Sequence, residues 1–370
     1  MTDQLRWQEI GARLRQARLA AGYSQEQLGR LIDLDGNKVA KTESGVRHLQ
    51  ALELVQLTSV LGVPMSYFLT EPPAVLSHRT ELVDEQDTDA ARDTFHLETE
   101  LAAWLRDVRQ LMGFGTLAHT PPLQFDRPVY DAKDARFAAS WLRNTLGFAA
   151  EPLGTMVDVA ERAGQYILAT DIRGEGASLI DGDVAVAVVS THPEPARRRA
   201  TAAHELGHMV LGDEYSSDLG VHSSREQREQ VIDAFAAELL IPTSAFHRER
   251  FGGTGDAVRR ELIKMSAEYR VSWSLTLRQA VHAAAIEDRV RTGYLMSRAP
   301  TRAEIMQAVG WAPQPDFESV RVSPGVADAV LAAVQQKRIT PKRAAELTRG
   351  QIDATDLLSG LDDAGDADEW

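Results

Sequence analysis

Two histidines stand four residues apart in the stretch RRRATAAHELGHMVLG, residues 197–212, with a glutamate directly after the first. On an α-helix, residues i and i+4 are offset by about 40°, so His204 and His208 would share one face and could bind one zinc ion. Glu205 would lie beside the metal, where a carboxylate can hold a zinc-activated water. The spacing therefore predicts a catalytic zinc site of the peptidase type.

The competing interpretation is a helix in which one histidine packs and the other is exposed. The neighbouring residues favour the metal site, because burying two imidazoles and a carboxylate is costly unless they are paired or bind metal. These neighbours are small or apolar: Ala200, Ala202, Ala203, Leu206, Gly207, Met209, Val210 and Leu211.

A catalytic zinc takes three protein ligands and keeps a fourth position open. The extended pattern HExxHxxGxxH is absent, because Leu211 and Glu214 stand where it has glycine and its last histidine. The third ligand must then come from another helix, and apolar spacing predicts one within SREQREQVIDAFAAELLIP, residues 224–242.

Glu229 is the first candidate for the third ligand, since the 21 residues after His208 leave room for a loop and a return helix. Glu226 and Asp233 are the alternatives, and Asp233 would otherwise orient a zinc-binding histidine from behind. A solvated position in a charged run is the competing interpretation of Glu229. Glu238, nine residues further on, points roughly the opposite way.

These helices are expected inside a mixed block, residues 129–290. Helices are predicted for DARFAASWLRNTLGF and TMVDVAERAG, and strands for QYILATDI and DVAVAVVS. Residues 71–128 are expected to be an acidic linker, flexible at first, that ends in an amphipathic helix within FHLETELAAWLRDVRQLM. Residues 291–370 should form helices around a turn at RITP and end in a disordered acidic tail.

The first 70 residues are expected to be all-helical, with tight turns. Ser24 is a good N-cap, and Gln27 completes a capping box before a short helix. A turn at DLDG leads into NKVAKTESG, and LQALELVQLTSVLGV should pack over both through Leu49, Leu52, Leu57 and Leu61. Two short helices joined by a tight turn are typical of a helix-turn-helix unit, with a dimerisation bundle as the alternative.

The second of these helices would enter the major groove of DNA, with Val39 packed inward and Asp35 near its start. The side chains expected to reach phosphates or base edges are Gln25, Asn37, Lys38, Lys41 and Arg47. Residues 11–48 carry seven Lys or Arg against four Asp or Glu, although the whole chain has a formal charge of −14. The acidic excess lies in residues 71–100 and 353–370, so it does not exclude nucleic acid.

The N-terminal pattern LRQARLAAGYSQEQLGRLI…KVAKTESG…LELVQLTSVLGV resembles the Xre/Cro-repressor family of helix-turn-helix domains over residues 9–69. The resemblance implies binding to a double-stranded DNA operator. The mild positive charge suggests modest affinity, which formation of a homodimer would raise.

RRRATAAHELGHMVLG followed by EQVIDAFAAELLIP resembles the ImmA/IrrE family of zinc metallopeptidases, over about residues 135–285. The resemblance implies an α+β zincin-like domain, a small sheet plus the HExxH helix, that cleaves a repressor or antitoxin and often releases stress genes. The expected fold is thus multidomain: an all-α helix-turn-helix domain, this domain, and a helical C-terminal region.

Two functions follow from these patterns. The first is a DNA-binding regulator with a zinc-dependent endopeptidase of narrow specificity. The second is a regulator without proteolysis, whose peptidase-like domain senses a metal or a small molecule. The chain lacks cysteine, a signal-peptide pattern and an apolar run of about 18 residues, so we expect a cytoplasmic protein with no membrane partner.

Two features remain unassigned by pattern alone. Tyr215, His222 and Tyr269 are candidates for polarising a substrate carbonyl, although a structural role is the more common one for such residues. ITPKRAAELTRGQ could be mistaken for a second DNA-binding motif, but its acidic surroundings favour a helical cap that packs on the peptidase domain or binds the partner.

Overall fold

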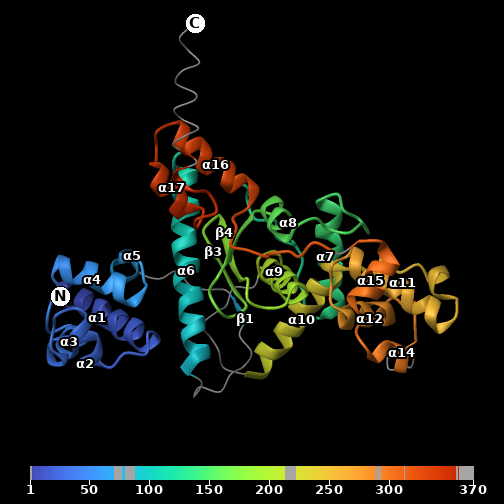
Figure 1. Ribbon diagram of the computed structural model, residues 1–370, viewed down its shortest axis with the longest axis horizontal. Coiled ribbons are helices and arrows are strands. Elements are labelled where there is room, and N and C mark those ends of the chain that lie inside the picture. Colours follow the sequence, from blue (N-terminus) through green and yellow to red (C-terminus); the bar gives the residue numbers. More distant parts are fainter. Residues whose placement is uncertain are drawn as a thin grey trace, which may run out of the picture.

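The chain folds as a group of N-terminal helices followed by a small sheet with helices on both of its faces (Figure 1). The computed structural model describes residues 2–70, 77–79, 88–212, 222–287, 290, 293–311, 313–355 and 357. Most of the predicted flexible linker and of the acidic tail lie outside these described residues. Among the described residues, no helix has both the length and the hydropathy that crossing a membrane requires.

Five helices build the N-terminal part. They are α1 (Thr2–Ala20), α2 (Gln25–Leu31), α3 (Gly36–Glu43), α4 (Ala51–Leu61) and α5 (Met65–Leu69). Their shared core includes Leu14, Leu28, Val39, Leu57 and Phe68, each at most 1% exposed. The inward position predicted for Val39 is therefore confirmed.

Local signals set the ends of these helices as the sequence indicates. The capping box of Ser24 and Gln27 is present at the start of α2. The Asp35 carboxylate accepts the Lys38 amide at the start of α3, and this hydrogen bond lowers the pKa of Asp35. The packing prediction for Leu52 was wrong: its side chain is 78% exposed, because the inner face of α4 is the one that carries Leu57 and Leu61.

The sheet has four strands in the order β1-β3-β4-β2. These are β1 (Ser77–Arg79), β2 (Gln165–Thr170), β3 (Gly176–Asp181) and β4 (Val184–Ser190). β4 pairs antiparallel with β3 and parallel with β2, while β1 adds antiparallel to the outer edge of β3. All residues of β2 and β4 are buried, as expected for strands that are covered on both faces.

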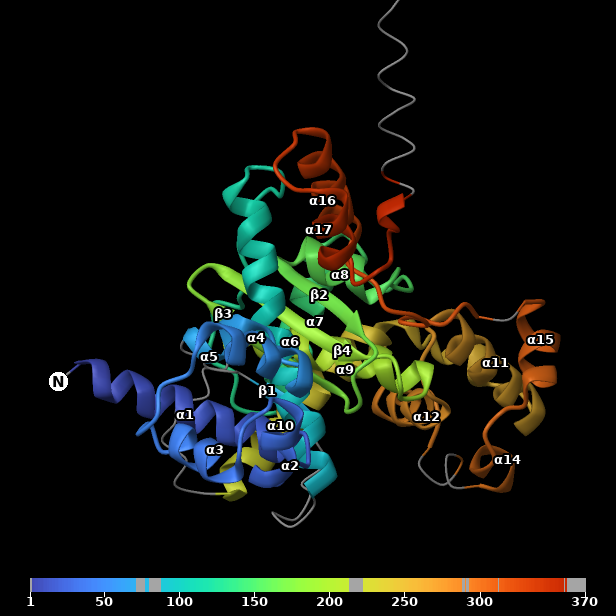
Figure 2. The same ribbon diagram turned by 60° about the vertical axis from the view of Figure 1, so that its left-hand side comes forward.

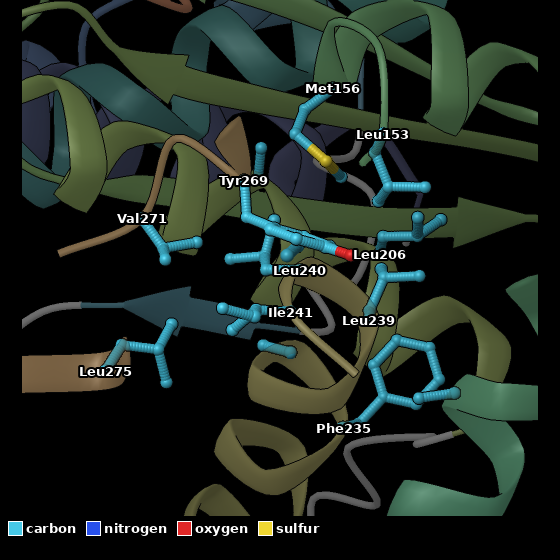
Figure 3. Packing of buried hydrophobic residues seen from close by; sticks show 14 of the residues in the cluster. Leu153, Met156, Leu206, Phe235, Leu239, Leu240, Ile241, Tyr269, Val271 and Leu275 are labelled. Carbon is cyan, nitrogen blue, oxygen red and sulfur yellow. The ribbon is translucent and has the colours of Figure 1, made fainter. Parts of the chain in front are cut away.

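The first face of the sheet carries the main core, in which Ala185, Ala187 and Val189 of β4 point toward the helices. These helices are α7 (Ala132–Thr145), α8 (Met156–Arg162), α9 (Pro195–Val210) and α10 (His222–Leu240). Figure 3 shows Leu206 of α9 packed near Phe235 and Leu239 of α10. The helices predicted around the HELGH stretch are thus present.

The second face is covered by α6 (Thr88–Gly113), α16 (Pro324–Gln335) and α17 (Pro341–Leu347). All five apolar residues that predicted the amphipathic helix are buried on α6: Leu97, Leu101, Trp104, Leu105 and Val108.

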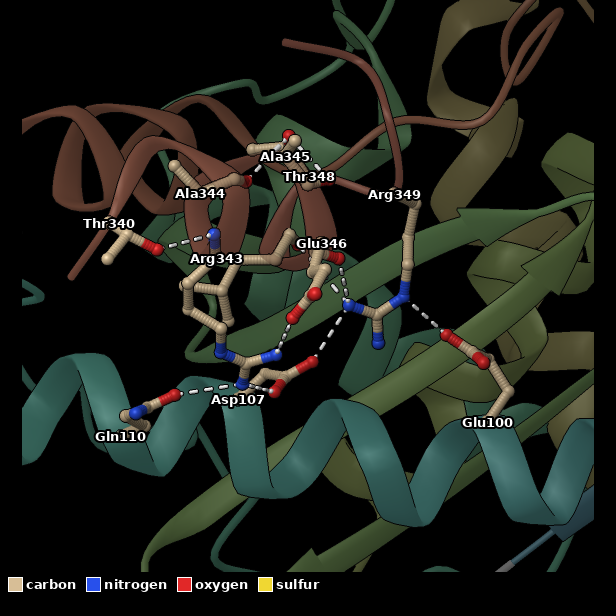
Figure 4. Close-up of polar contacts among 11 residues, drawn as sticks. Glu100, Asp107, Gln110, Thr340, Arg343, Ala344, Ala345, Glu346, Thr348 and Arg349 are labelled. Atoms are coloured by element: carbon tan, nitrogen blue, oxygen red, sulfur yellow. Dashed lines mark hydrogen bonds and ion pairs between the residues drawn. The ribbon is translucent and has the colours of Figure 1, made fainter. Parts of the chain in front are cut away.

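Two arginines of the C-terminal segment bind acidic residues on this face. Arg343 and Arg349 both contact Asp107 of α6, at 2.6 and 2.8 Å, and Arg349 also binds Glu100 (Figure 4). Since Ala344 and Leu347 of α17 are fully buried, the helical cap predicted for this segment is confirmed.

The remaining helices gather at the end of the molecule opposite α1–α5 (Figure 2). They are α11 (Gly255–Glu268), α12 (Trp273–His282), α14 (Tyr294–Ser297) and α15 (Arg302–Val309), with short 3₁₀ turns at Thr243–Ala245 and Arg248–Phe251. Asp316, in a turn after α15, binds the buried Arg199 of α9 and so ties this C-terminal part to the core.

Candidate metal centre and nucleic-acid interface

Helix α9 positions the two histidines inside the protein. It begins at Pro195, a favoured first residue, and runs between the sheet and α10, so that nearly all of its residues after Thr201 are buried. Gly207 makes this packing close: a Cβ there would lie 3.0 Å from Phe235 and 3.1 Å from Ile232 of α10. A larger residue would push α10, and the carboxylates that it carries, away from α9.

His204, His208 and Glu229 converge at one point between α9 and α10. Their candidate ligand atoms all lie within 4.8 Å of one another. The two Nε2 atoms are 3.1 Å apart, and Glu229 Oε2 lies 3.0 Å from that of His204 and 4.0 Å from that of His208. The histidine side chains are at most 2% exposed and that of Glu229 is 30% exposed, so the trio opens toward solvent only on the glutamate side.

This donor set fits a zinc ion. Bonds of about 2.0–2.1 Å in tetrahedral geometry place neighbouring ligand atoms about 3.3 Å apart. Two separations in the trio, 3.0 and 3.1 Å, are close to this value, while Glu229 Oε2 and His208 Nε2, 4.0 Å apart, would have to approach each other. Two neutral imidazole nitrogens and one carboxylate also match a catalytic zinc site, in which three protein ligands leave a fourth position open. The arrangement can therefore hold zinc with small side-chain adjustments.

Asp233 lies behind His204 rather than among the ligand atoms. Its Oδ1 is 2.9 Å from Nδ1 of His204, while Nε2 of the same ring faces His208 and Glu229. A carboxylate on the far ring nitrogen fixes the tautomer that presents a lone pair at Nε2. Of the three acidic residues considered for the third ligand, Glu229 has the position of a ligand and Asp233 that of an orienting group, whereas Glu226 is exposed and outside the trio.

Glu205 is directed toward β3. Its Oε2 accepts a hydrogen bond of 2.7 Å from Ser178 Oγ, and the residue is fully buried. Its Oε1 has no hydrogen-bond partner among the described residues. At Gly176 an added Cβ would lie 2.6 Å from Thr201 and 3.4 Å from Glu205 Oε1, so glycine is what allows β3 to approach the helix here.

Ser178 and Gly176 did not emerge from the sequence as site residues. The available signal was a serine placed between apolar residues of a buried strand, in GASLID. Such a polar residue needs a buried partner, but the sequence does not say which one, because the contact joins β3 to a helix 27 residues away.

The other predicted candidates lie away from the trio. Glu238 binds Thr243, Gln279 and Arg136, so it points away from the metal position as expected. The Tyr269 hydroxyl donates to the Ala150 carbonyl within the main core, and burial raises its pKa, which indicates a structural role. Tyr215 lies outside the described residues, and His222 is described only as the first residue of α10.

The predicted DNA-contact residues of α3 lie together on its outer surface. Asn37, Lys38 and Lys41 are exposed, while Val39 and Thr42 on the opposite side are buried. The Lys38 ammonium lies 3.5 Å from the exposed Asp35 carboxylate, a contact weak enough to give way to a phosphate. These three side chains can reach DNA without disturbing the core.

Gln25 and Arg47, the other two predicted contacts, are engaged within the protein. Gln25 donates to Glu43, and Glu43 also binds Arg18, with the side chains of that ion pair only 8% and 5% exposed. Arg47 forms a bidentate pair with Glu53, whose hydrogen bond raises the pKa of Arg47. Gln25 thus links α2 to α3, and Arg47 links the segment after α3 to α4, whereas Asn37, Lys38 and Lys41 face outward.

Two family models match the chain. A helix-turn-helix domain matches residues 9–66, and an IrrE N-terminal-like domain of the M78 peptidase family matches residues 160–279. The second match contains the trio and Ser178.

The curated relatives fall into the same two groups. The radiation response metalloprotease IrrE of Deinococcus radiodurans is 35% identical over 100 residues, 24% of this chain and 30% of the relative. An HTH-type transcriptional regulator of Sinorhizobium medicae is 33% identical over 64 residues, 17% of this chain and 46% of the relative. The HTH-type transcriptional regulator RamB of Mycobacterium tuberculosis is 22% identical over 310 residues, 71% of this chain.

None of these matches extends over two thirds of the relative: the chain spans 30%, 46% and 63% of the three proteins. No solved structure matches the chain.

Proposed function

We propose that this chain, which joins a helix-turn-helix domain to an IrrE-like metallopeptidase domain, is a DNA-binding transcription regulator that cleaves a protein partner. The observation that carries the proposal is the buried trio of His204, His208 and Glu229, whose ligand atoms lie within 4.8 Å. The trio supplies three zinc ligands, and the IrrE-like family implies a metal, typically zinc.

Zinc bound by the trio would supply a Lewis acid that polarises a peptide carbonyl and lowers the pKa of a bound water toward 7. Glu205 would take the proton of the attacking water and pass it to the leaving amine. Ser178 holds one oxygen of that carboxylate and leaves the other to accept the proton. Asp233 would keep His204 in the tautomer that binds metal.

Each segment expected from the sequence is assigned one role in this proposal. We assign DNA binding to residues 1–70, a connecting role to 71–128, peptidase activity to 129–290, and a covering role to 291–370. The partner that is cleaved would be a repressor or an antitoxin, by analogy with the resemblance to ImmA/IrrE. Binding to operator DNA would place this activity in the cytoplasm.

A homodimer through α4 belongs to the same proposal. Leu52 and Val55 on α4 are 78% and 51% exposed, which is a reason to expect a partner surface there. Helix-turn-helix dimers bind two half-sites about one helical turn of DNA apart. Replacing Leu52 with Lys should convert the dimer to a monomer in sedimentation and weaken binding to operator DNA.

The test of proteolysis is Glu205→Gln, which keeps the shape of the side chain but removes its capacity to accept a proton. In cells, the substrate should persist intact in this variant, and a new N-terminus should appear only with the wild-type chain. Glu194→Gln, an exposed residue at the start of the same helix, is the matched control. Identical sets of N-termini in wild type and Glu205→Gln would reject the peptidase.

The second candidate is a regulator without proteolysis, whose peptidase-like domain senses a metal or small molecule. The similarity to RamB, an HTH-type transcriptional regulator, extends over 71% of this chain and favours this candidate. Metal analysis separates the peptidase from a sensor of a small molecule: zinc far below one per chain, with DNA binding intact, supports that sensor.

A further inference from the structure

The outer edge of β3 is occupied by a strand from a distant part of the chain. β1 pairs antiparallel with β3 so that Ser77 lies opposite Ser178 and Arg79 opposite Gly176. β1 belongs to the connection between α5, the last helix of the N-terminal group, and α6. The described residues of this connection are the three of β1 itself.

This edge lies next to Glu205. Ser178 and Gly176, which lie opposite Ser77 and Arg79 of β1, are both beside the Glu205 carboxylate: Ser178 donates a hydrogen bond to it, and a Cβ added at Gly176 would lie 3.4 Å from its Oε1. They share the face of the sheet that packs against α9, because the alternate residues Ala177 and Leu179 point into the core on the opposite face. β1 also contacts α9, and Figure 1 places it at the border of the sheet on the side of α9 and α10.

An open strand edge is the natural place for an extended peptide to bind, because its unpaired amides and carbonyls can hydrogen-bond a new strand. With β1 in place, that edge of β3 is already paired. Glu205 is then fully buried although one of its oxygens has no hydrogen-bond partner among the described residues. While β1 is paired, an extended peptide cannot reach the Glu205 carboxylate along β3. The carboxylate nevertheless lies beside the β3 edge to which such a peptide would bind.

We propose that residues 77–79 form an internal strand that blocks the β3 edge and keeps the metal centre closed to extended peptides in the resting chain. The inference rests on the proposed peptidase function and adds its regulation. β1 must leave β3 before a protein substrate can pair at Gly176 and Ser178. The blocked and open states therefore differ in the pairing of three residues.

The position of β1 in the chain couples this block to the helix-turn-helix domain. From Leu69, the end of α5, to Ser77 is a stretch of eight residues, which can span at most about 29 Å when fully extended. If the N-terminal helices move farther from β1 than this stretch can span, the chain pulls on β1. β1 is affected before α6 because it comes first along the chain. Binding of DNA or of a partner at residues 1–70 can in this way release the strand.

Amide hydrogen exchange in the full zinc-loaded chain tests the block. The amides of adjacent strand residues point to opposite sides, so only one of residues 77 and 78 donates to β3. Proline has no amide N–H, and prolines at both positions therefore remove that donor whichever of the two it is. In Ser77→Pro/His78→Pro, exchange at the β3 amides that face β1 should rise at least tenfold over the control Ala74→Pro. Exchange along β2 and β4 should stay unchanged and shows that the sheet is intact. Equal exchange at β3 in the two variants would overturn the proposal.

The absence of cysteine allows a second variant that keeps the strand in place. His78 and Ala177 are directly opposite, so His78→Cys/Ala177→Cys should form a disulfide on mild oxidation. Arg79→Cys/Ala177→Cys is the matched control, because the next residue along β1 presents its side chain to the other face of the sheet. Equal cross-linking in both variants would contradict the register of β1 and the block with it.

A binding experiment then tests access. A fluorescent peptide of residues 74–82, AVLSHRTEL, is titrated into zinc-loaded chains that carry Glu205→Gln to prevent cleavage. The peptide should bind the double-proline chain at least tenfold more tightly than the chain with wild-type β1. Equal affinity for the two chains would overturn the block.

None of these three measurements depends on proteolysis. If strand pairing and peptide binding change as expected while Glu205→Gln leaves every cellular protein unaffected, the peptidase function fails and the occluding strand remains. If the N-termini differ in cells but the β3 amides do not respond, the inference fails alone.

Discussion

The α9–α10 pair and helix α3 place polar functional side chains in opposite environments. His204 and His208 are buried and depend on neighbouring groups, whereas Asn37, Lys38 and Lys41 of α3 face solvent. Burial of uncompensated polar groups costs free energy, so the first site is expected to be stable only with its metal and its carboxylates. The exposed side chains of α3 cost little free energy, but they need a rigid helix core beneath them to hold them in position.

That support is itself a buried ion pair. Glu43, at the end of α3, binds Arg18 of α1 at 2.5 Å and accepts a hydrogen bond from Gln25 of α2. The two regions thus differ in where the buried polar cluster lies: at the functional site in α9–α10, and underneath it in the helix-turn-helix. Variants in either cluster should affect stability, and variants of the exposed lysines should affect only binding.

The largest effect is expected from removing the metal. At free zinc a thousandfold above its dissociation constant, binding stabilises the folded chain by about 4 kcal/mol. Chelation should therefore lower the melting temperature of the peptidase part by roughly 8–16 °C. His208→Ala should have that low melting temperature from the outset and should not respond to chelator. His282→Ala is the control, and an unchanged response in His208→Ala would reject the trio.

Breaking the support of the helix-turn-helix should come next in size. Arg18→Met leaves Glu43 buried without its cation, which costs about 3–5 kcal/mol. Denaturation followed through α3 should shift accordingly, while zinc content stays constant. Arg15→Met, an exposed position on the same helix, is the control. Adding Glu43→Leu should recover part of the loss, and no recovery would mean that packing rather than charge is responsible.

Asp233→Asn tests the orienting carboxylate behind His204. Loss of such a group weakens metal binding about 10–100-fold. Zinc affinity, measured by competition with a chelator, should fall by this factor while Glu226→Gln on the same helix stays at the wild-type value. The opposite ranking would make Glu226 the residue that serves the metal.

How far the sequence predicted these two clusters depends on the range of the contacts. His204, Glu205 and His208 share one helix, and Glu229 and Asp233 share another, so helical periodicity was sufficient to group them. Ser178 beside Glu205, and Arg18 beside Glu43, join elements through tertiary packing that periodicity does not encode. Leu52 shows the same limit, since apolar spacing alone cannot tell which face of α4 is covered.

A smaller, acid-dependent effect is expected at Glu53 in the helix-turn-helix. The hydrogen bond from Arg47 holds the pKa of this carboxyl below its ordinary value. A lowered folded-state pKa contributes stability that is complete above the unfolded value of about 4.3 and is lost as the pH falls below it. Protection of the α3 amides, measured as the ratio of intrinsic to observed exchange rate, should therefore fall below about pH 4.3, and Glu53→Gln should remove this pH dependence. An identical acid profile in the variant would exclude the Arg47–Glu53 pair as its source.

Replacing Lys38 or Lys41 should have the smallest effect on stability and the most selective effect on DNA binding. Both side chains are exposed, so alanine at either position should change the free energy of unfolding by less than about 0.5 kcal/mol. Each lysine that contacts a phosphate should contribute about 0.9 to the slope of log affinity against log salt. Titration of random-sequence duplex DNA at several salt concentrations measures this slope, with Lys133→Ala on α7 as the exposed control. A slope unchanged in Lys38→Ala/Lys41→Ala would remove α3 from the DNA interface, because a helix lying in the major groove cannot keep these two ammonium groups away from the phosphates.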